Sequence, residues 1–248
     1  MELKVISFNI RCCDDDNGNS IKERAPRLAK ITSAYDADII AFQEYTVPWE
    51  EEIAKFYPEY EIFNKYRSVS ELESAPILWK RDKFECIDKG YFWLSDTPTV
   101  ESRGWDELYN CWRMCEYVTL KHIESGKTFT HMNTHYGFGD KGQTDSSRLI
   151  YEYSKKITKQ PTLITGDFNM YPTSKGYGEM VKHFTDVNTA TVNDRRTTYH
   201  GYGKVDNAHI DYCFINGKIK PLSLKIIDET VDKKYPSDHY GLFIRLDI

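Results

Sequence analysis

The stretch TLITGDFN, residues 162–169, joins a short apolar run to a glycine, a carboxylate and an amide. Residues 162–165 are predicted to form a buried strand that stops at Gly166. Asp167 and Asn169 then lie just beyond the strand end, where a sheet presents side chains to a cleft. A Gly-Asp turn without function is the alternative for this motif taken alone.

The same arrangement recurs on both sides of this stretch. An apolar run over residues 3–9 ends at Asn9, and a second run over 38–42 leads to Glu44. Further candidates surround later apolar runs: His135, Asp211, Asp238 and His239. Each residue alone could cap a turn, begin a helix or serve as a structural histidine. Together, carboxylates and amides without cysteine predict an oxygen-rich site suited to Mg²⁺ or Mn²⁺.

Amphipathic segments alternate with β-branched runs throughout the chain, which favours a mixed α/β (α+β) domain. A capping box at Ser20 and Glu23 predicts a helix that ends near residue 35, and further helices are predicted at 48–56 and 145–158. Other strands are predicted at 75–79, 117–122, 127–133, 208–215, 222–227 and 241–246. No repeat or linker divides the chain, so one domain spanning residues 1–248 is expected.

Composition narrows the class of protein further. The 248 residues contain 33 Lys and Arg against 38 Asp and Glu, for a formal net charge of −5. This acidic balance argues against broad binding of long nucleic acid, although a bound cation could still hold a single phosphate. No apolar run approaches the roughly 20 residues that span a bilayer, and the first residues do not resemble a signal peptide, so a cytoplasmic protein is expected. Nothing predicts a protein partner.

The six cysteines indicate no zinc site, because no Cys-x-x-Cys pair occurs among them. Reduced thiols in a reducing compartment are the favoured interpretation. A disulfide remains an alternative that the spacing does not resolve.

Six short motifs lie in a fixed order between Ser7 and His239: SFNIR, AFQE, NTH, GDFN, IDY and SDH. In this order they resemble the endonuclease/exonuclease/phosphatase superfamily, with its deoxyribonuclease-I-like fold. The resemblance implies a four-layer α/β/β/α sandwich of two packed mixed β-sheets flanked by helices. YFWLSDTP, GWD and TTYHGY further resemble a mostly bacterial branch of undefined substrate. Departures at Glu116-Tyr117, at 136–138 and at His209 lie near the expected cleft and bear on substrate choice.

The resemblance also implies roles for individual residues. Asn9, Glu44 and Asp238 would hold or orient a divalent metal ion, Mg²⁺ or Mn²⁺. Asp167 and Asn169 would position and activate the attacking water and contact the phosphate.

A second group would act on the phosphoryl oxygens. His239 would hold them with Asp211 as its partner, and His135 would act similarly from the other side, paired with Glu73. Arg113 matches the position of a phosphate-contacting arginine.

These roles predict a metal-dependent hydrolase of phosphate esters, and three functions are consistent with the motifs. The first is a phosphodiesterase or nuclease-like enzyme that uses a metal- and Asp-activated water. The alternative is a phosphomonoesterase acting on a phosphorylated small molecule or lipid head group. A catalytically silent binding module is the least favoured, because every expected metal and acid residue is present.

Overall fold

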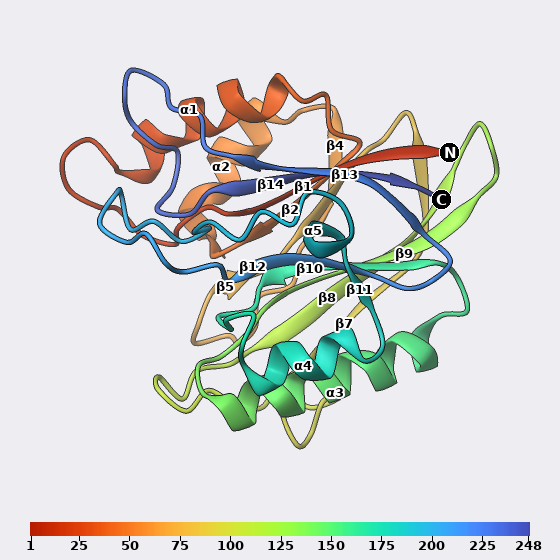
Figure 1. Ribbon diagram of the computed structural model, residues 1–248. Helices are drawn as coiled ribbons and strands as arrows, with labels where there is room; N and C mark the ends of the chain where they lie inside the picture. Colours follow the sequence, from red (N-terminus) through yellow and green to blue (C-terminus); the bar gives the residue numbers. More distant parts are fainter.

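The computed structural model describes residues 1–248, and two six-stranded sheets pack face to face at its centre (Figure 1). The first sheet has the order β13-β14-β1-β2-β6-β4. Its strands are β1 (Glu2–Asn9), β2 (Ile39–Gln43), β4 (Tyr60–Phe63), β6 (Ile77–Lys80), β13 (Lys220–Ile227) and β14 (Gly241–Asp247). Strands β1 and β2 run parallel and pair Asn9 with Gln43, so their carboxyl ends meet at one edge.

The second sheet has the order β11-β12-β10-β9-β8-β7. Its strands are β7 (Phe84–Trp93), β8 (Met114–His122), β9 (Thr128–His135), β10 (Thr162–Asp167), β11 (Thr185–Asp186) and β12 (Asp211–Ile215). Parallel β9 and β10 place His135 beside Asp167 in register. Outside both sheets, β3 (Tyr45–Thr46) and β5 (Glu73–Ser74) form a short antiparallel ladder.

Helices cover both outer faces of the sheet pair (Figure 1). Helices α1 (Ile21–Ser33) and α2 (Val47–Phe56) lie over the first sheet, and α3 (Asp140–Ile157) and α4 (Lys175–Val181) lie under the second; the short α5 (Val187–Ala190) packs against β12 and β13. The four-layer α/β/β/α sandwich expected from the sequence is therefore confirmed. None of these helices combines the length and apolarity needed to cross a membrane.

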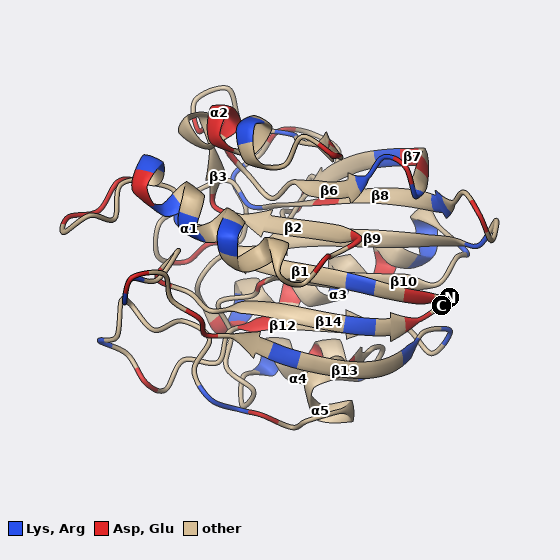
Figure 2. Cartoon of the chain, turned by 90° about the horizontal axis from the view of Figure 1, so that it is seen from above, with Lys and Arg blue, Asp and Glu red and all other residues tan.

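Alternating side chains build the layers of the core. On β1, Leu3 and Val5 face the second sheet, whereas Ile6 and Phe8 face α1 and α2. A third apolar cluster, which includes Ile150 of α3, lies on the outer face of the second sheet. Seen from above, Lys and Arg are interspersed with Asp and Glu along the helices, loops and strands (Figure 2).

The short elements β3, β4, β5, β11, α4 and α5 were not predicted, and two longer elements also differ from the sequence-based expectation. Helix α3 begins at Asp140 and not near residue 145, because Gly142 allows its first turn to approach the backbone carbonyl of Trp105, where a Cβ would lie 1.9 Å from the oxygen. Strand β7 was not predicted. It is an edge strand with a bulge between Cys86 and Asp88 and a largely exposed middle, so it lacks the alternation that identifies strands.

A buried amide connects the two sheets. The Asn133 side chain on β9 donates from Nδ2 to the backbone oxygens of Phe42 (2.7 Å), Ala75 (3.0 Å) and Pro76 (3.2 Å). Its Oδ1 accepts hydrogen bonds from the side chains of Gln43 (2.8 Å) and Thr165 (3.1 Å). Since Asn133 is completely buried, these bonds replace every contact with water and hold β2 against β9 and β10.

We expect Asn133→Leu to lower the free energy of unfolding by about 3 kcal/mol, because a similar volume is kept while carbonyls and donors lose their partner in a dry interior. Urea denaturation measures the change. Asn207→Leu, at an exposed position, is the control and should change stability by about 0.5 kcal/mol or less. An Asn133→Leu protein as stable as the control would contradict the structural role.

Candidate active site

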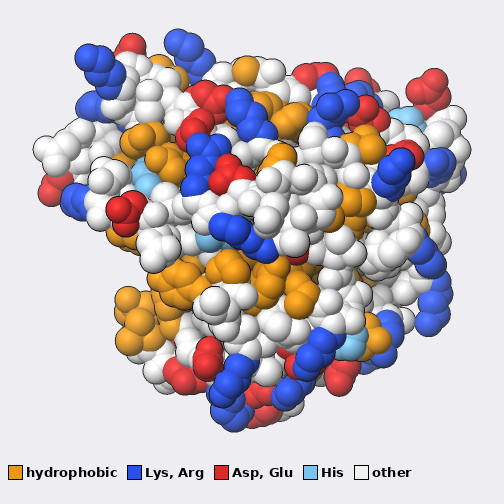
Figure 3. Space-filling model, viewed as in Figure 1, with side chains coloured by type: hydrophobic (Ala, Val, Ile, Leu, Met, Phe, Trp, Pro, Cys, Tyr) orange, Lys and Arg blue, Asp and Glu red, His pale blue; other side chains and the backbone are white.

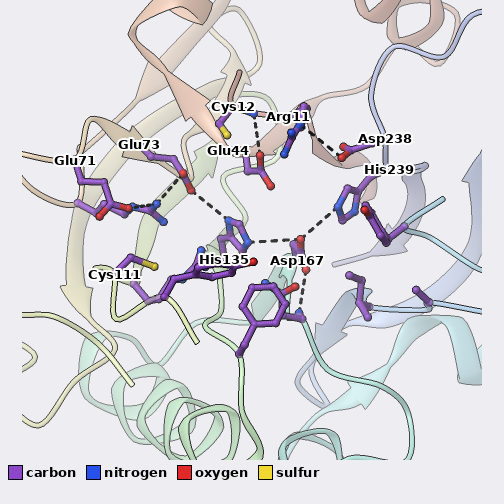
Figure 4. Close-up of a pocket in the computed structure, with 18 of the residues that line it drawn as sticks. Arg11, Cys12, Glu44, Glu71, Glu73, Cys111, His135, Asp167, Asp238 and His239 are labelled. Atoms are coloured by element: carbon purple, nitrogen blue, oxygen red, sulfur yellow. Dashed lines mark hydrogen bonds and ion pairs between the residues drawn. The ribbon is translucent and has the colours of Figure 1, made fainter. Parts of the chain in front are cut away.

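A cavity of about 660 Å³ opens where the strand ends of the two sheets meet (Figures 3 and 4). Eight of the ten residues predicted as site residues line it: Glu44, Glu73, Arg113, His135, Asp167, Asn169, Asp238 and His239. The other two lie directly behind the lining. Asn9 contacts Glu44 and Asp167, and Asp211 contacts His239. The structure therefore brings all ten predicted residues together.

Local backbone geometry directs the central carboxylates into the cavity. Glu44 follows β2 with a φ of 60°, in the left-handed region that non-glycine residues seldom adopt. Asn169 has a φ of 49°, and its backbone N–H donates to Oδ1 of Asp167. Gly166 continues β10 and does not form a turn; a Cβ there would lie 2.2 Å from the Thr134 carbonyl oxygen. Glycine thus lets β10 approach β9 next to Asp167.

The amide of Asn9 orients two carboxylates. Its Nδ2 donates to Oε1 of Glu44 and to Oδ2 of Asp167, both at 3.0 Å, while its Oδ1 accepts the backbone N–H of Arg11. The other Glu44 oxygen, Oε2, accepts the backbone N–H of Cys12 at 2.8 Å. Arg24 of α1 holds this loop by donating to the carbonyls at residues 11 and 13. Asn9 therefore acts as an orienting group, and its carbonyl oxygen also closes the local turn.

His239 and Asp211 form a buried pair. Nδ1 of His239 lies 3.0 Å from Oδ2 of Asp211, and Nε2 lies 3.6 Å from Oδ2 of Asp167. Burial alone would lower the pKa of His239, but the neighbouring carboxylates of Asp211, Asp167 and Asp238 raise it to about 10. At neutral pH this imidazole is a cation that donates into the cavity.

His135 has a similar place on the other side of Asp167 (Figure 4). Its Nε2 is 3.6 Å from Oδ2 of Asp167, and its Nδ1 is 3.4 Å from Oε1 of Glu73. Arg67 binds Glu73 through Nη2 at 2.7 Å. Burial raises the pKa of Glu73, but Arg67 and His135 outweigh it, so the pKa lies below its usual value. Glu73 is thus a fixed anion behind His135.

The central carboxylates are buried and close to one another. Burial raises the pKa of Asp167 and of Asp238, and each is raised further by a nearby carboxylate, Asp211 and Glu44 respectively. Glu44 keeps a pKa of about 2 despite burial, because His135, Asn9 and His239 favour its charge. Negative charge therefore persists here at neutral pH.

These residues fit a divalent metal ion. One ligand atom each from Glu44, Asp167 and His239 lies within 4.8 Å of the others. Carboxylate oxygens suit Mg²⁺ and Mn²⁺. A protonated imidazole cannot bind a metal, so the carboxylates are the better donors of the three. Asp238 lies outside this trio and is 3.7 Å from Nε of Arg11.

Several residues of the cavity were not assigned a role from the sequence. Arg11, within SFNIR, pairs with Asp15 and approaches Asp238. Arg67 and Glu71 come from the segment before β5, which has no recognisable motif.

Arg113, by contrast, was predicted as a site residue. Its Nε and Nη2 both lie 3.0 Å from Oδ2 of Asp106.

Glu116 is a buried carboxylate that holds the segment carrying Arg67 and Glu73. From β8, its two oxygens accept the backbone N–H groups of Ala75 (2.9 Å) and Lys65 (3.0 Å). Burial raises the pKa of Glu116 to about 8, although these two hydrogen bonds oppose the shift. Glu116 therefore closes both ends of this segment against the second sheet.

Comparison with known proteins connects this geometry to a family. The model of the Endonuclease/Exonuclease/phosphatase family matches residues 6–239. A family protein of this description from Bacteroides thetaiotaomicron has 26% sequence identity and a TM-score of 0.91, over 100% of this chain and 99% of that one. A mannosyl-6-phosphatase from the same organism has 25% identity and a TM-score of 0.90, over 99% of this chain and 100% of that one.

A viral relative is also similar. An uncharacterized protein of Acanthamoeba polyphaga mimivirus is 24% identical over 243 residues, which cover 83% of this chain. The match spans only 35% of that protein, so this chain corresponds to about a third of the length of that curated relative.

Glu116→Gln should change how stability depends on pH. An acid whose pKa is raised from 4.5 to about 8 by folding stabilises the folded state below pH 4.5 and loses that contribution as the pH rises through 8. The free energy of unfolding of the wild type, relative to the variant, should therefore fall by about 3 kcal/mol between pH 5 and pH 8. Urea denaturation in chelator measures it. A difference independent of pH would show that Glu116 does not titrate in this range.

Asp211→Asn should lower the pKa of His239, because burial then acts against the imidazolium without its nearest counter-charge. NMR titration of the histidine side chains in metal-free protein measures the shift. The wild-type ring should remain protonated until about pH 10, and the variant ring should lose its proton at a lower pH. Asp206→Asn, at an exposed position, serves as the control. Equal pKa values in wild type and Asp211→Asn would refute the pairing.

Proposed function

Because the chain belongs to the Endonuclease/Exonuclease/phosphatase family, whose members hydrolyse phosphate esters, we propose that it is a divalent-metal-dependent phosphomonoesterase acting on small molecules. The sequence favoured a diesterase ahead of a monoesterase, and we propose the reverse order on the basis of the charges that line the cavity. The observation that carries the proposal is the pairing of every cavity arginine with carboxylates.

Each arginine of the cavity already has an acidic partner. Arg11 is bound to Asp15, Arg67 to Glu73, and Arg113 to Asp106. A nucleic acid strand would bring several phosphates along the cavity, and each needs an uncompensated cation. The cavity supplies such charge only around Asp167, where His239 and a metal ion would hold one phosphate.

Two further observations support a small substrate. A cavity of about 660 Å³ is within the range that accommodates small organic ligands. The similarity to a mannosyl-6-phosphatase extends over 99% of the chain.

The geometry supports the following division of labour. A bound Mg²⁺ or Mn²⁺ ion would neutralise charge on the phosphoryl oxygens. Glu44, which belongs to the trio of closest donors and is oriented by Asn9, would hold this ion, and Asp238, which lies outside that trio, is the second ligand expected from the sequence. Asp167, fixed by the backbone N–H of Asn169, would accept a proton from the water that attacks phosphorus.

Two histidines complete the reaction. His239, charged beside Asp211, would donate to a nonbridging phosphoryl oxygen as negative charge develops there. His135, with Glu73 behind it, would supply a proton to the ester oxygen as its bond to phosphorus breaks. Arg113 supports this side of the cavity from its ion pair with Asp106.

Diester hydrolysis is the second candidate, favoured by exposed aromatic rings at the rim. Tyr109 and Tyr171 line the cavity with exposed fractions of 65% and 51%, and aromatic faces stack on nucleobases. A substrate comparison separates the two functions.

We expect the protein to hydrolyse 4-nitrophenyl phosphate with Mg²⁺ or Mn²⁺, to be inactive in chelator, and to hydrolyse bis(4-nitrophenyl) phosphate more slowly. Asp167→Asn should lower kcat by about 10²–10⁴-fold, since proton acceptance is lost, while its urea unfolding stays cooperative. Asp145→Asn, on the surface of α3, should keep wild-type kcat. A faster diester rate would favour the second candidate, and full activity of Asp167→Asn would refute the assignment.

A further inference from the structure

Resting on this proposed function, we propose that the cavity beyond His135 binds an uncharged, hydroxyl-rich leaving group such as a monosaccharide. We call this part the polar arm and define it by its lining: Arg67, Glu71, Tyr109, Cys111 and Arg113. In Figure 4, Glu71 and Cys111 lie on the opposite side of His135 from Asp167.

The location of the arm suits a leaving group. His135 approaches Asp167 through Nε2 and Glu73 through Nδ1, so it stands between the phosphate position and the arm. The group that receives its proton is the departing ester oxygen. The remainder of the released alcohol then extends past His135 into the polar arm.

The charge balance of the arm excludes a second phosphate. Arg67 forms ion pairs with Glu71 and Glu73, and Arg113 pairs with Asp106. Two guanidinium groups thus face three carboxylates. A second phosphate would lose its hydration on entering the arm, and both guanidinium groups there already pair with carboxylates. Its desolvation would therefore cost free energy that no new ion pair offsets. An uncharged molecule has no such penalty.

The arm offers donors and acceptors side by side. Arg67 and Arg113 line the arm although their side chains are only 8% and 6% exposed, so each presents a small part of its side chain to the cavity. The carboxylate of Glu71 forms an ion pair with the guanidinium of Arg67. A hydroxyl group donates and accepts at once, so neighbouring hydroxyls can bridge a guanidinium and a carboxylate where a purely anionic group cannot.

The polar groups are held in place before any ligand binds. Arg67 donates its backbone N–H to the Glu73 carbonyl (3.0 Å), and its own carbonyl accepts Nε1 of Trp93 (2.8 Å). Glu116 binds the segment at residues 65 and 75. Ordered side chains lose little entropy on binding, which favours recognition of a small neutral molecule.

An aromatic platform completes the arm. Tyr109 packs edge-on against Phe138, with ring centroids 5.4 Å apart, and both rings line the cavity. The exposed face of Tyr109 can cover the C–H face of a sugar ring while the hydroxyl edges reach Arg67 and Glu71.

Three substrates that each carry a phosphate on a primary alcohol test the proposal: glucose 6-phosphate, cyclohexylmethyl phosphate, which lacks the hydroxyls, and glucose 1,6-bisphosphate, which adds an anion. Mannose and galactose 6-phosphates extend the hydroxyl-bearing set. With Mg²⁺, kcat/KM for the best hexose 6-phosphate should exceed both other values at least about tenfold, roughly the effect of one charge-assisted hydrogen bond.

Glu71→Gln should reduce this preference about tenfold, chiefly through KM for the hexose phosphate. The control is Glu101→Gln, which removes a carboxylate that accepts from Ser68 on the same segment but lies outside the cavity lining. It should keep the wild-type preference. Equal kcat/KM for the hexose and cyclohexyl esters, a preference for the bisphosphate, or an unchanged preference in Glu71→Gln would overturn the proposal.

Saturation-transfer NMR with the phosphate-free hexose examines the arm without turnover. Binding in the wild type that is lost in Glu71→Gln supports the polar arm. If such binding occurs while every monoester is inert, the proposed function fails and the arm stands. If monoesters are hydrolysed but no hexose binds, the arm is overturned and the proposed function stands.

Discussion

The buried amide of Asn133 is the interaction on which the site depends. It joins backbone carbonyls of the first sheet to Gln43 and Thr165, and these partners lie next to the functional residues. Gln43 precedes Glu44, and Thr165 is two residues before Asp167. Apolar packing between sheets has no direction and tolerates sliding, whereas one amide with five partners permits a single relative position. The distance between Glu44 and Asp167 follows from that position.

Electrostatics then determine what this geometry can do. Buried carboxylates at one point would repel one another, and the fold offsets that repulsion with histidines, the amide of Asn9 and backbone N–H groups. His239 becomes a cation because Asp211, Asp167 and Asp238 lie beside it, and Glu44 stays an anion at the same pH because His135, Asn9 and His239 favour its charge. The remaining negative charge is what a divalent cation would balance. Part of the net charge of −5 thus belongs to the site.

Much of the fold and of the site could be predicted from local pattern. The apolar runs ending at Asn9, Glu44 and Asp167 are continuous and buried, so strand and strand end are both visible in the sequence. Edge strand β7 was not predicted because the side chains in its middle are largely exposed, so apolar and polar residues do not alternate along it. Arg67 and Glu71 escaped because their segment has no regular structure, and its position depends on Glu116. Neither hydrogen bond leaves a periodic signal in sequence.

The sequence by itself determined the residue types, the order of the motifs and the positions of most of the long strands, because the strands follow from short-range patterns of apolar and polar side chains. Only the tertiary structure decided which charges meet. Arg113 and Asp106 are seven positions apart and pair, Arg67 and Glu73 are six apart and pair, and Asn9 reaches across 158 positions to Asp167. Such pairings depend on the stacking of two sheets. The tertiary structure therefore also determines whether each arginine of the cavity is paired with a carboxylate, and hence which ligands the cavity can bind.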